Sequence, residues 1–493
     1  MKAPPHPPLE QLDPTHAWEP WQPGPGDPWN LRWAGHLYRR AGFGPSLAEL
    51  REAVRRGPAW TLDHLLHAQP GAAEREQTLT ALGDEVAKQN DVSSLRGWWV
   101  YLILNSLYPL REKLTLFWHN HFATSIAKVG RTELMFRQNQ VLRHDALGNF
   151  RPLLLDISRD PAMLIWLDSN SNLKGKANEN YARELMELFS LGIGHYTEHD
   201  VREAARAFTG WHTDGERFDF DEAFHDDGEK TILGKTGKWD GGDVLRIILA
   251  QPEAAQFLVR KLYRHFISET APPSQLLRPL AEQFRRSDYD IAALIGTMLR
   301  SRHFFSAYAY RQRVKSPVEF VVGTARALVK IDQAELPPTV LAAQIGAMGE
   351  PLFEPPTVKG WSGGRSWLNS ATILARDNFA ALAASGNYPA EAESSNGAIL
   401  AAPTAQGNSK PQPDHEPPGN RDPAVLIEAE KARTPEQIAD VVVELLLQGD
   451  ISTKARARLV AFLEEGKPHG KQRSRRIREA LHAVMTMPEY QLA

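Results

Sequence analysis

The feature that most constrains the fold is the return of apolar residues at helix spacing in one segment after another. Residues 31–41 carry leucine, alanine and tyrosine three or four positions apart, which places them on one side of an α-helix. Ser316, followed by a proline and then by Glu319, marks the start of another helix. Similar stretches occupy residues 95–106, 110–121, 133–142 and 161–167. The pattern predicts a mainly α protein, a bundle of many helices.

One segment follows a different rhythm. Phe218 and Phe220 alternate with polar residues, as in a strand with one buried face. The turn-forming residues 225–228 and the short run 231–234 come next. We therefore expect one small β-hairpin near residues 216–234, appended to the helices.

The distribution of proline and glycine divides the chain into four parts. Residues 1–30 are rich in proline, which fixes φ and removes hydrogen-bond donors, so we expect an extended arm. Residues 31–384 form the predicted main helical domain. Residues 385–423 are rich in small and polar residues and predict a flexible insertion. Helical spacing returns in residues 424–493, the predicted C-terminal helical subdomain.

Composition excludes several classes of function. A formal net charge of -3 supplies no general attraction to nucleic acid, so we expect no nucleic-acid partner. The chain has no cysteine, which excludes disulfides, thiolate metal sites and a cysteine nucleophile. No apolar run is long enough to span a bilayer. The first residues lack the apolar core of a signal peptide, so the sequence as written predicts a cytoplasmic protein, or a periplasmic or exported one if a leader is missing.

A polar loop after residues 161–167 carries oxygen-rich side chains. Positions 1, 3, 5 and 12 of a calcium-loop template are occupied by Asp168, Asn170, Asn172 and Glu179. The loop departs from the template where Leu173 replaces a glycine, and Lys174 and Lys176 oppose a cation. These residues are candidate ligands for a divalent cation such as calcium. The alternative is an asparagine-rich turn that caps the next helix.

The helix predicted after this loop brings carboxylates together. Glu184 and Glu187 are three residues apart and share a face beside apolar residues. Two such carboxylates can serve as general acid and base or, with a histidine, as metal ligands. The candidate catalytic residues are His121, Arg183, Glu184 and Glu187. The alternative is a salt-bridged helix edge.

Two further places are candidate binding sites. His225, Asp226 and Asp227 lie at the predicted hairpin turn, and loop tips often carry function, although a plain turn explains them most simply. Trp361 lies in the irregular, aromatic segment 349–367. Residues two apart on a helix point in different directions, so His119 is not expected to form a ligand pair with the histidine at 121.

Nine blocks of sequence, in order, resemble a known bacterial family. They are H-L-Y-R-R-A-G-F-G at 36–44, F-W-H-N-H-F at 117–122, D-P-A-M-L-I-W-L-D at 160–168, N-E-N-Y-A-R-E-L-M-E-L at 178–188, A-R-A-F-T-G-W at 205–211, H-D-D-G-E-K-T-I-L-G at 225–234, K-L-Y-R-H-F at 261–266, K-S-P-V-E-F at 315–320 and V-K-G-W-S-G-G at 358–364. The chain resembles the domain-of-unknown-function 1800 family. Members are often encoded beside a protein that resembles the alkaline phosphatase and sulfatase superfamily, and many look exported. The resemblance therefore implies a partner of that kind, and it leaves the compartment open because this chain as written shows no leader.

Two functional hypotheses remain open, and the sequence does not decide whether the protein is an enzyme. The first is a metal-assisted hydrolase or related enzyme that uses a Glu/His/Asn cluster in a helical bundle. The second is a non-catalytic scaffold or chaperone-like protein that binds a phosphatase- or sulfatase-like partner. The first predicts that the carboxylates converge in a hollow. The second predicts that they pair with arginines on a convex surface.

Overall fold

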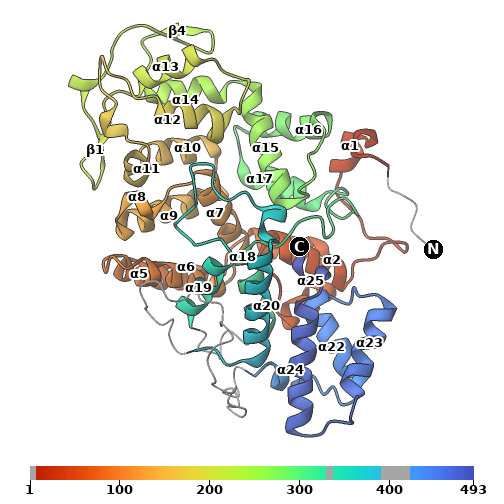
Figure 1. Ribbon diagram of the computed structural model, residues 1–493. Helices are drawn as coiled ribbons and strands as arrows, with labels where there is room; N and C mark the ends of the chain where they lie inside the picture. The colour runs from red at the N-terminus through yellow and green to blue at the C-terminus, as the bar shows by residue number, and fades with distance from the viewer. Residues whose placement is uncertain (1–6, 329–336, 390–421) are drawn as a thin grey trace.

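The computed structural model describes residues 7–328, 337–389 and 422–493. These residues form 25 α-helices and two small antiparallel sheets of two strands each, so the predicted mainly α fold is confirmed (Figure 1). Most of the predicted insertion at 385–423 lies outside the described residues.

The first third of the chain contains helices and no strands among its described residues. Its elements are η1 Leu9–Gln11, α1 Pro14–Trp18, α2 Leu31–Ala41, α3 Leu47–Arg56, α4 Pro58–Leu66, α5 Ala72–Ala87, α6 Val92–Asn105, α7 Pro109–His121, α8 Ile126–Val129, α9 Thr132–Asp145, α10 Phe150–Ser158 and α11 Pro161–Trp166.

The middle of the chain contains both sheets. Its elements are η2 Ser169–Ser171, α12 Asn180–Glu184, the π-helical segment η3 Leu185–Ser190, α13 Glu198–Ala207, β1 Trp211–Thr213, β2 Phe218–Phe220, η4 Glu222–Phe224, β3 Lys230–Ile232, β4 Lys235–Gly237 and α14 Gly241–Leu249.

The last part returns to helices. Its elements are α15 Pro252–Phe266, α16 Ser274–Arg286, α17 Ile291–Arg300, α18 Pro317–Leu328, α19 Pro338–Ala347, η5 Gly364–Trp367, α20 Ser370–Ser385, α21 Pro423–Ala429, α22 Pro435–Leu447, α23 Thr453–Glu464, α24 Lys471–Met485 and α25 Pro488–Gln491. The predicted start of α18 is confirmed, because the Ser316 hydroxyl accepts from the Glu319 N–H and the Glu319 carboxylate accepts from the Ser316 N–H.

Two hydrophobic cores hold the helices together. The first is built from residues between Ala17 and Tyr310 and includes α7, α10 and α15. The second draws on residues between Phe43 and Tyr490, and in it the C-terminal helices α22 and α24 pack with α6, α18 and α20 (Figure 1). The helices after residue 423 therefore share their core with helices from the first third of the chain.

The predicted single hairpin at 216–234 is wrong. Strand β2 pairs with β1 before it, in the register Trp211 to Phe220, and β3 pairs with β4 after it. Each pair closes over its own short turn. The turn between β3 and β4 has positive φ at both Leu233 and Gly234, the geometry of a tight hairpin turn. Local turns of this kind require no pairing across residues 221–229.

The proline-rich arm is also less extended than predicted. Its residues 14–18 form α1, because Asp13 caps the helix by accepting from the Thr15 N–H and Pro14 occupies the first helical position. Trp18 is 7% exposed, and its indole N–H donates to the Leu276 carbonyl over 2.7 Å. The arm is thus fastened to the first core by its tryptophan.

Within the described ranges, no helix combines the length and the apolar character that crossing a membrane demands.

Candidate functional site

The asparagines of the calcium-like loop are held by backbone groups. Asn170 donates to the Thr213 carbonyl over 2.9 Å and accepts from the Thr213 N–H over 2.8 Å. Asn172 is 3% exposed; it donates to the Ala205 carbonyl and accepts from the Asn178 N–H. Both ends of each amide are therefore used inside the fold.

The acids of that loop are paired with cations. Asp168 lies 2.8 Å from the ammonium of Lys128, and Glu179 lies 2.8 Å from the guanidinium of Arg183, which also binds Glu198. Among the residues that the structure describes, no group of three or more His, Asp or Glu side chains is placed to hold a metal ion. The calcium site stays a prediction, and the hydrogen bonds favour its alternative, the asparagine-rich turn.

The helix that follows changes geometry halfway along. After α12 the chain widens into the π-helical segment η3, where the N–H groups of Leu191 and Gly192 both donate to the Met186 carbonyl. Side chains from α15 and α7 form hydrogen bonds with the carbonyls of Leu188 and Phe189. Lys261 donates to the Leu188 carbonyl over 2.9 Å. The π segment was not predicted, and such segments are frequent at functional sites.

His121 binds the same segment and Lys261. Its Nε2 lies 3.1 Å from the Phe189 carbonyl oxygen, and its Nδ1 lies 2.9 Å from the Lys261 ammonium. Burial, with the charge of Lys261, lowers the pKa of His121 well below its usual value. Burial lowers the pKa of Lys261 to about 7. This pattern fits a neutral imidazole whose two nitrogens are both engaged, so His121 joins three helical segments.

The two residues before His121 hold the aromatic loop 349–367. His119 accepts from the Phe353 N–H, and Asn120 accepts from the Trp361 N–H over 2.6 Å while donating to its carbonyl. Gly360 has φ +74°, and a side chain there would meet the Asn120 carbonyl oxygen at 2.5 Å. The predicted divergence of the two histidines is confirmed. The Trp361 ring is 6% exposed and packs against His119.

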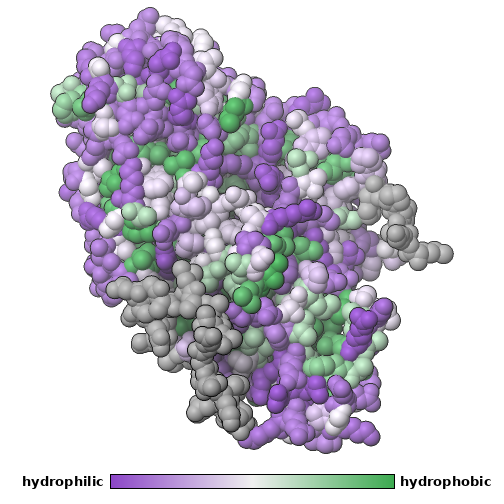
Figure 2. Space-filling model, viewed as in Figure 1, coloured by the Kyte–Doolittle hydropathy of each residue, from purple (hydrophilic) through white to green (hydrophobic). Residues whose placement is uncertain are grey.

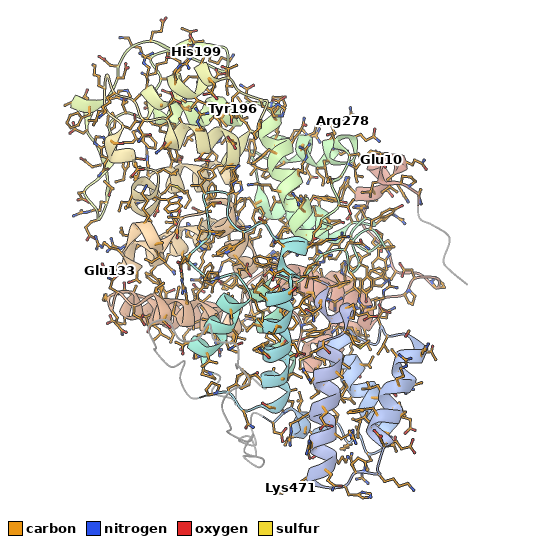
Figure 3. The ribbon with its side chains drawn as sticks, in the orientation of Figure 1. Glu10, Glu133, Tyr196, His199, Arg278 and Lys471 are labelled. Carbon is orange, nitrogen blue, oxygen red and sulfur yellow. The ribbon has the colours of Figure 1, made fainter. Side chains whose placement is uncertain are left out.

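This loop carries Lys359 to the two candidate carboxylates. The Lys359 ammonium lies 3.8 Å from Glu187, and the hydroxyl of Tyr196 donates to the same carboxylate over 3.3 Å (Tyr196 is labelled in Figure 3). Burial, and then the charge of Glu187, raises the pKa of Glu184. The structure thus brings Glu184 and Glu187 together, half-buried, whereas Arg183 pairs with other acids.

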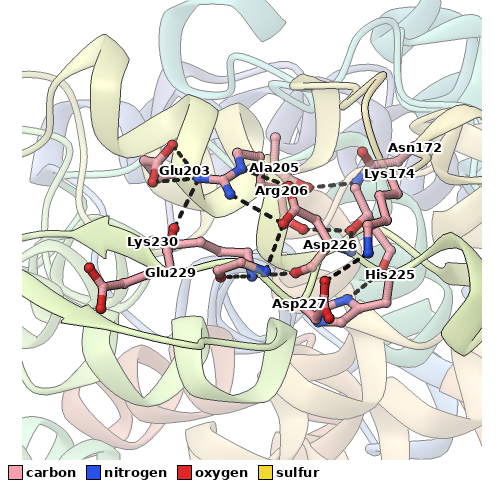
Figure 4. Close-up of polar contacts among 12 residues, drawn as sticks. Asn172, Lys174, Glu203, Ala205, Arg206, His225, Asp226, Asp227, Glu229 and Lys230 are labelled. Atoms are coloured by element: carbon pink, nitrogen blue, oxygen red, sulfur yellow. Dashed lines mark hydrogen bonds and ion pairs between the residues drawn. The ribbon is translucent and has the colours of Figure 1, made fainter.

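The predicted binding turn, residues 225–227, is held by a network of ion pairs and hydrogen bonds (Figure 4). Asp226 pairs with Arg206 over 2.8 Å, and the hydrogen bonds from Arg206 lower the pKa of that carboxyl. Lys230, 1% exposed, donates to the Asp226 carbonyl and to the Gly228 carbonyl. These contacts fasten β3 to α13.

The residues on either side of Asp226 also have partners within the fold. His225 Nδ1 lies 2.9 Å from the Thr209 carbonyl oxygen, and Asp227 pairs with Lys174 over 2.7 Å. Asp227 is exposed, but His225 is half-buried. A role in binding stays a prediction for these residues, since their contacts already explain them as part of the fold.

A cavity of about 510 Å³ lies elsewhere, between α2–α6 and α18; we call it the α2–α6 cavity. Its apolar wall is formed by Phe43, Leu47, Leu65, Ile103, Leu104 and Leu107. Cavities of roughly 300–1,000 Å³ with apolar walls are typical of small-molecule sites.

An ion pair is built into the wall of this cavity. Ser46 caps α3 in a box with Glu49, and the same carboxylate accepts from Arg326 of α18 over 2.7 and 2.9 Å. Burial alone would raise the pKa of Glu49, but Arg326 and Ser46 together lower it. Gly323 lets α18 approach, because a side chain there would lie 2.5 Å from the Phe43 carbonyl oxygen.

Other polar side chains also line the cavity, among them His64, Tyr38 and Arg75. Burial lowers the pKa of His64, whose ring stacks on Trp60 with centroids 4.7 Å apart. The Tyr38 hydroxyl is buried and has no hydrogen-bond partner among the described residues. Arg75 is exposed at this site. The cavity therefore offers an apolar body with a few polar groups.

A family model described as "Protein of unknown function (DUF1800)" matches residues 36–492, nearly the whole chain. The chain belongs to the DUF1800 family. No curated protein and no solved structure matches it. The DUF1800 match includes every residue named above as lining the cavity, as well as the H-N-H tripeptide and the π segment. It carries no information on partners or compartment, so the phosphatase- or sulfatase-like partner, the absence of a nucleic-acid partner and the location stay predictions.

Sequence reasoning missed the α2–α6 cavity. Its wall in this DUF1800 protein comes from segments as distant as Tyr38 and Glu430, so no single motif describes it. One signal was available. The block at 36–44 supplies Tyr38, Gly42, Phe43 and Gly44 to the lining, but it was assigned no role.

Proposed function

We propose that this protein binds a small molecule with an apolar body in the α2–α6 cavity. The observation that supports the proposal is the cavity itself, about 510 Å³ in volume and walled by apolar side chains. The Glu49–Arg326 pair and His64 would orient a polar group of the ligand, and Arg75 gives the site a cation suited to an anionic group.

Filling the cavity tests the proposal. Leu104, 5% exposed on the wall, is replaced by tryptophan, and binding of the dye anilinonaphthalene sulfonate is measured by fluorescence. We expect the wild type to bind one dye molecule and Leu104→Trp to lose at least tenfold in affinity. Thermal melting checks that the variant is folded.

Two control variants locate the dye. Leu82→Trp introduces the same side chain at a position on α5 that is 44% exposed. Figure 2 shows a hydrophobic patch over the N-terminal end of α20, where Ile373 and Leu374 are 52% and 50% exposed, and Leu374→Ser disrupts it. Both controls should bind dye like the wild type. If Leu104→Trp binds as well as they do, or Leu374→Ser abolishes binding, the cavity is not the site.

A second candidate function is acid–base chemistry at Glu184 and Glu187, as in the hydrolase hypothesis. The raised pKa of Glu184 beside a carboxylate held by Tyr196 and Lys359 favours it, because such pairs divide the roles of acid and base. Carbon NMR of the glutamate side chains should show Glu184 titrating above ordinary carboxyls, and higher still in Lys359→Met. An ordinary pKa in both proteins would remove this candidate. The interaction hypothesis stays a prediction.

A further inference from the structure

A cluster of buried cations lies beside the α2–α6 cavity, and two of the sequence blocks, 36–44 and 315–320, contribute residues to it. Six basic side chains that are at most 9% exposed gather around two buried carboxyl groups; they are Arg39, Arg40, Lys113, Arg313, Lys315 and Arg376, with Glu319 and Glu350. Burying a charge without a partner is costly. Burial lowers the pKa of Lys113 to about 8 and the pKa of Lys315 well below its ordinary value, so the cluster carries its positive charge at a cost that a bound anion would offset.

The two carboxyl groups do not balance the cluster. Glu319 is already bound by Lys113 and by Arg313, and its second oxygen accepts from the Ser316 N–H. Burial raises the pKa of Glu350 to about 7, so this group is only partly charged near neutrality. Of the carboxylates farther out, Asp450 pairs with Arg311 over 3.1 Å.

Several N–H groups of these cations have no acceptor. Within the described residues, Nε and Nη2 of Arg39 and Nε and Nη1 of Arg40 are buried without a hydrogen-bond partner. Nη1 of Arg39 donates to the side-chain amide oxygen of Gln448, and Nη2 of Arg40 donates to the backbone carbonyl of Ala309. The Lys315 ammonium lies 3.6 Å from the centroid of the Tyr490 ring. Buried donors of this kind normally find partners.

A small chamber opens among these side chains. Its volume is about 20 Å³, and Arg39, Phe43, Lys315, Glu319, Gln448 and Tyr490 line it. That volume is close to the room that one water molecule needs. Water would satisfy donors but would leave the charge excess unchanged.

We propose that this cationic chamber binds a single small anion of the size of chloride. The anion would accept from the free N–H groups of Arg39 and lie beside the Lys315 ammonium, which the ring of Tyr490 holds in place. A halide bound only by the folded state stabilises that state in proportion to its saturation.

Halide dependence of the melting temperature tests the proposal. The melting temperature of the wild type is measured in about 1 to 100 mM sodium chloride, a range wide enough to show saturation. Sodium gluconate holds the ionic strength constant. We expect the melting temperature to rise by a few degrees and then level off, and bromide to act like chloride. Crystals soaked in bromide should show an anomalous peak between Arg39 and Lys315.

Variants assign the effect to the chamber. Lys315→Met and Arg39→Met should remove the halide response and the bromide peak, whereas Arg55→Met, which alters an exposed arginine on α3, should keep both. If Lys315→Met or Arg39→Met does not fold, the wild-type titration and the bromide peak still decide. A melting temperature that ignores chloride, with no bromide peak in the chamber, would overturn the proposal, because Lys315 would then be neutral.

One control concerns the chain itself. Ala493 also lines the chamber, and its N–H donates to the Arg313 carbonyl. If the melting temperature responds to halide only after Ala493 is removed, then a group of the polypeptide itself fills the chamber in the full chain. That result would overturn the proposal. An unchanged response in that variant supports the proposal.

Discussion

Two polar regions of this protein look alike by composition and differ in how their hydrogen bonds are used. The region around Asn172 and Asp226 is dense in side chains that resemble ligands, yet each has a partner within the fold. The cluster around Arg39 and Lys315 matches no ligand-binding template, yet it contains buried donors without acceptors. The difference teaches that a binding site is better indicated by unsatisfied groups than by ligand-capable residues. The predictions below test this contrast.

The largest effect is expected at Glu319. Glu319→Gln removes the charge that pairs with Lys113 and Arg313 in a buried setting, and breaking such a pair costs about 3–5 kcal/mol. Urea unfolding measures the loss. Glu350→Gln at pH 6 is the matched control, since Glu350 is equally buried but its raised pKa leaves it largely neutral. Equal losses in the two variants would contradict the assigned charges.

A smaller effect is expected in the satisfied region. Asn172→Ala leaves the Ala205 carbonyl and the Asn178 N–H without their partner, which costs about 1–3 kcal/mol. Asp168→Asn should cost at most about 1 kcal/mol, because its pair with Lys128 is exposed. The thermal melting of the wild type should be the same with and without a chelator. A melting temperature lowered by chelation would restore the calcium hypothesis. It would also contradict the contrast drawn between the two polar regions.

The last effect depends on pH and concerns Glu350. Its folded pKa of about 7 lies above that of an unfolded carboxyl, so the wild type loses stability as pH rises through that interval. Glu350→Gln has no such loss. The variant should match the wild type near pH 5 and exceed it by about 1–2 kcal/mol at pH 8, measured by urea unfolding across the range. A difference independent of pH would show that Glu350 does not titrate there.

Part of the candidate site could be predicted from the sequence. Glu184 and Glu187 share a helix face because they are three residues apart, and the structure brings them together. Their neighbours Lys359 and Tyr196 were not predicted, because Lys359 is delivered by the loop that Asn120 holds. His121 was expected to join the carboxylates, but Phe189 and Lys261 engage its ring. Lys359 and Lys261 come from distant segments of the chain, whereas Tyr196 lies nine residues after Glu187.

The sequence by itself determined where helices begin and which faces they bury, as Ser316 and Glu319 show for α18. Those features depend on residues a few positions apart, so local spacing encodes them. Only the tertiary structure decided how strands pair, which polar groups are satisfied, and that Glu319 also neutralises Lys113 and Arg313. A buried donor is satisfied by whichever acceptor the fold brings within reach, and for Lys113 that acceptor is Glu319, which lies 206 residues away along the chain.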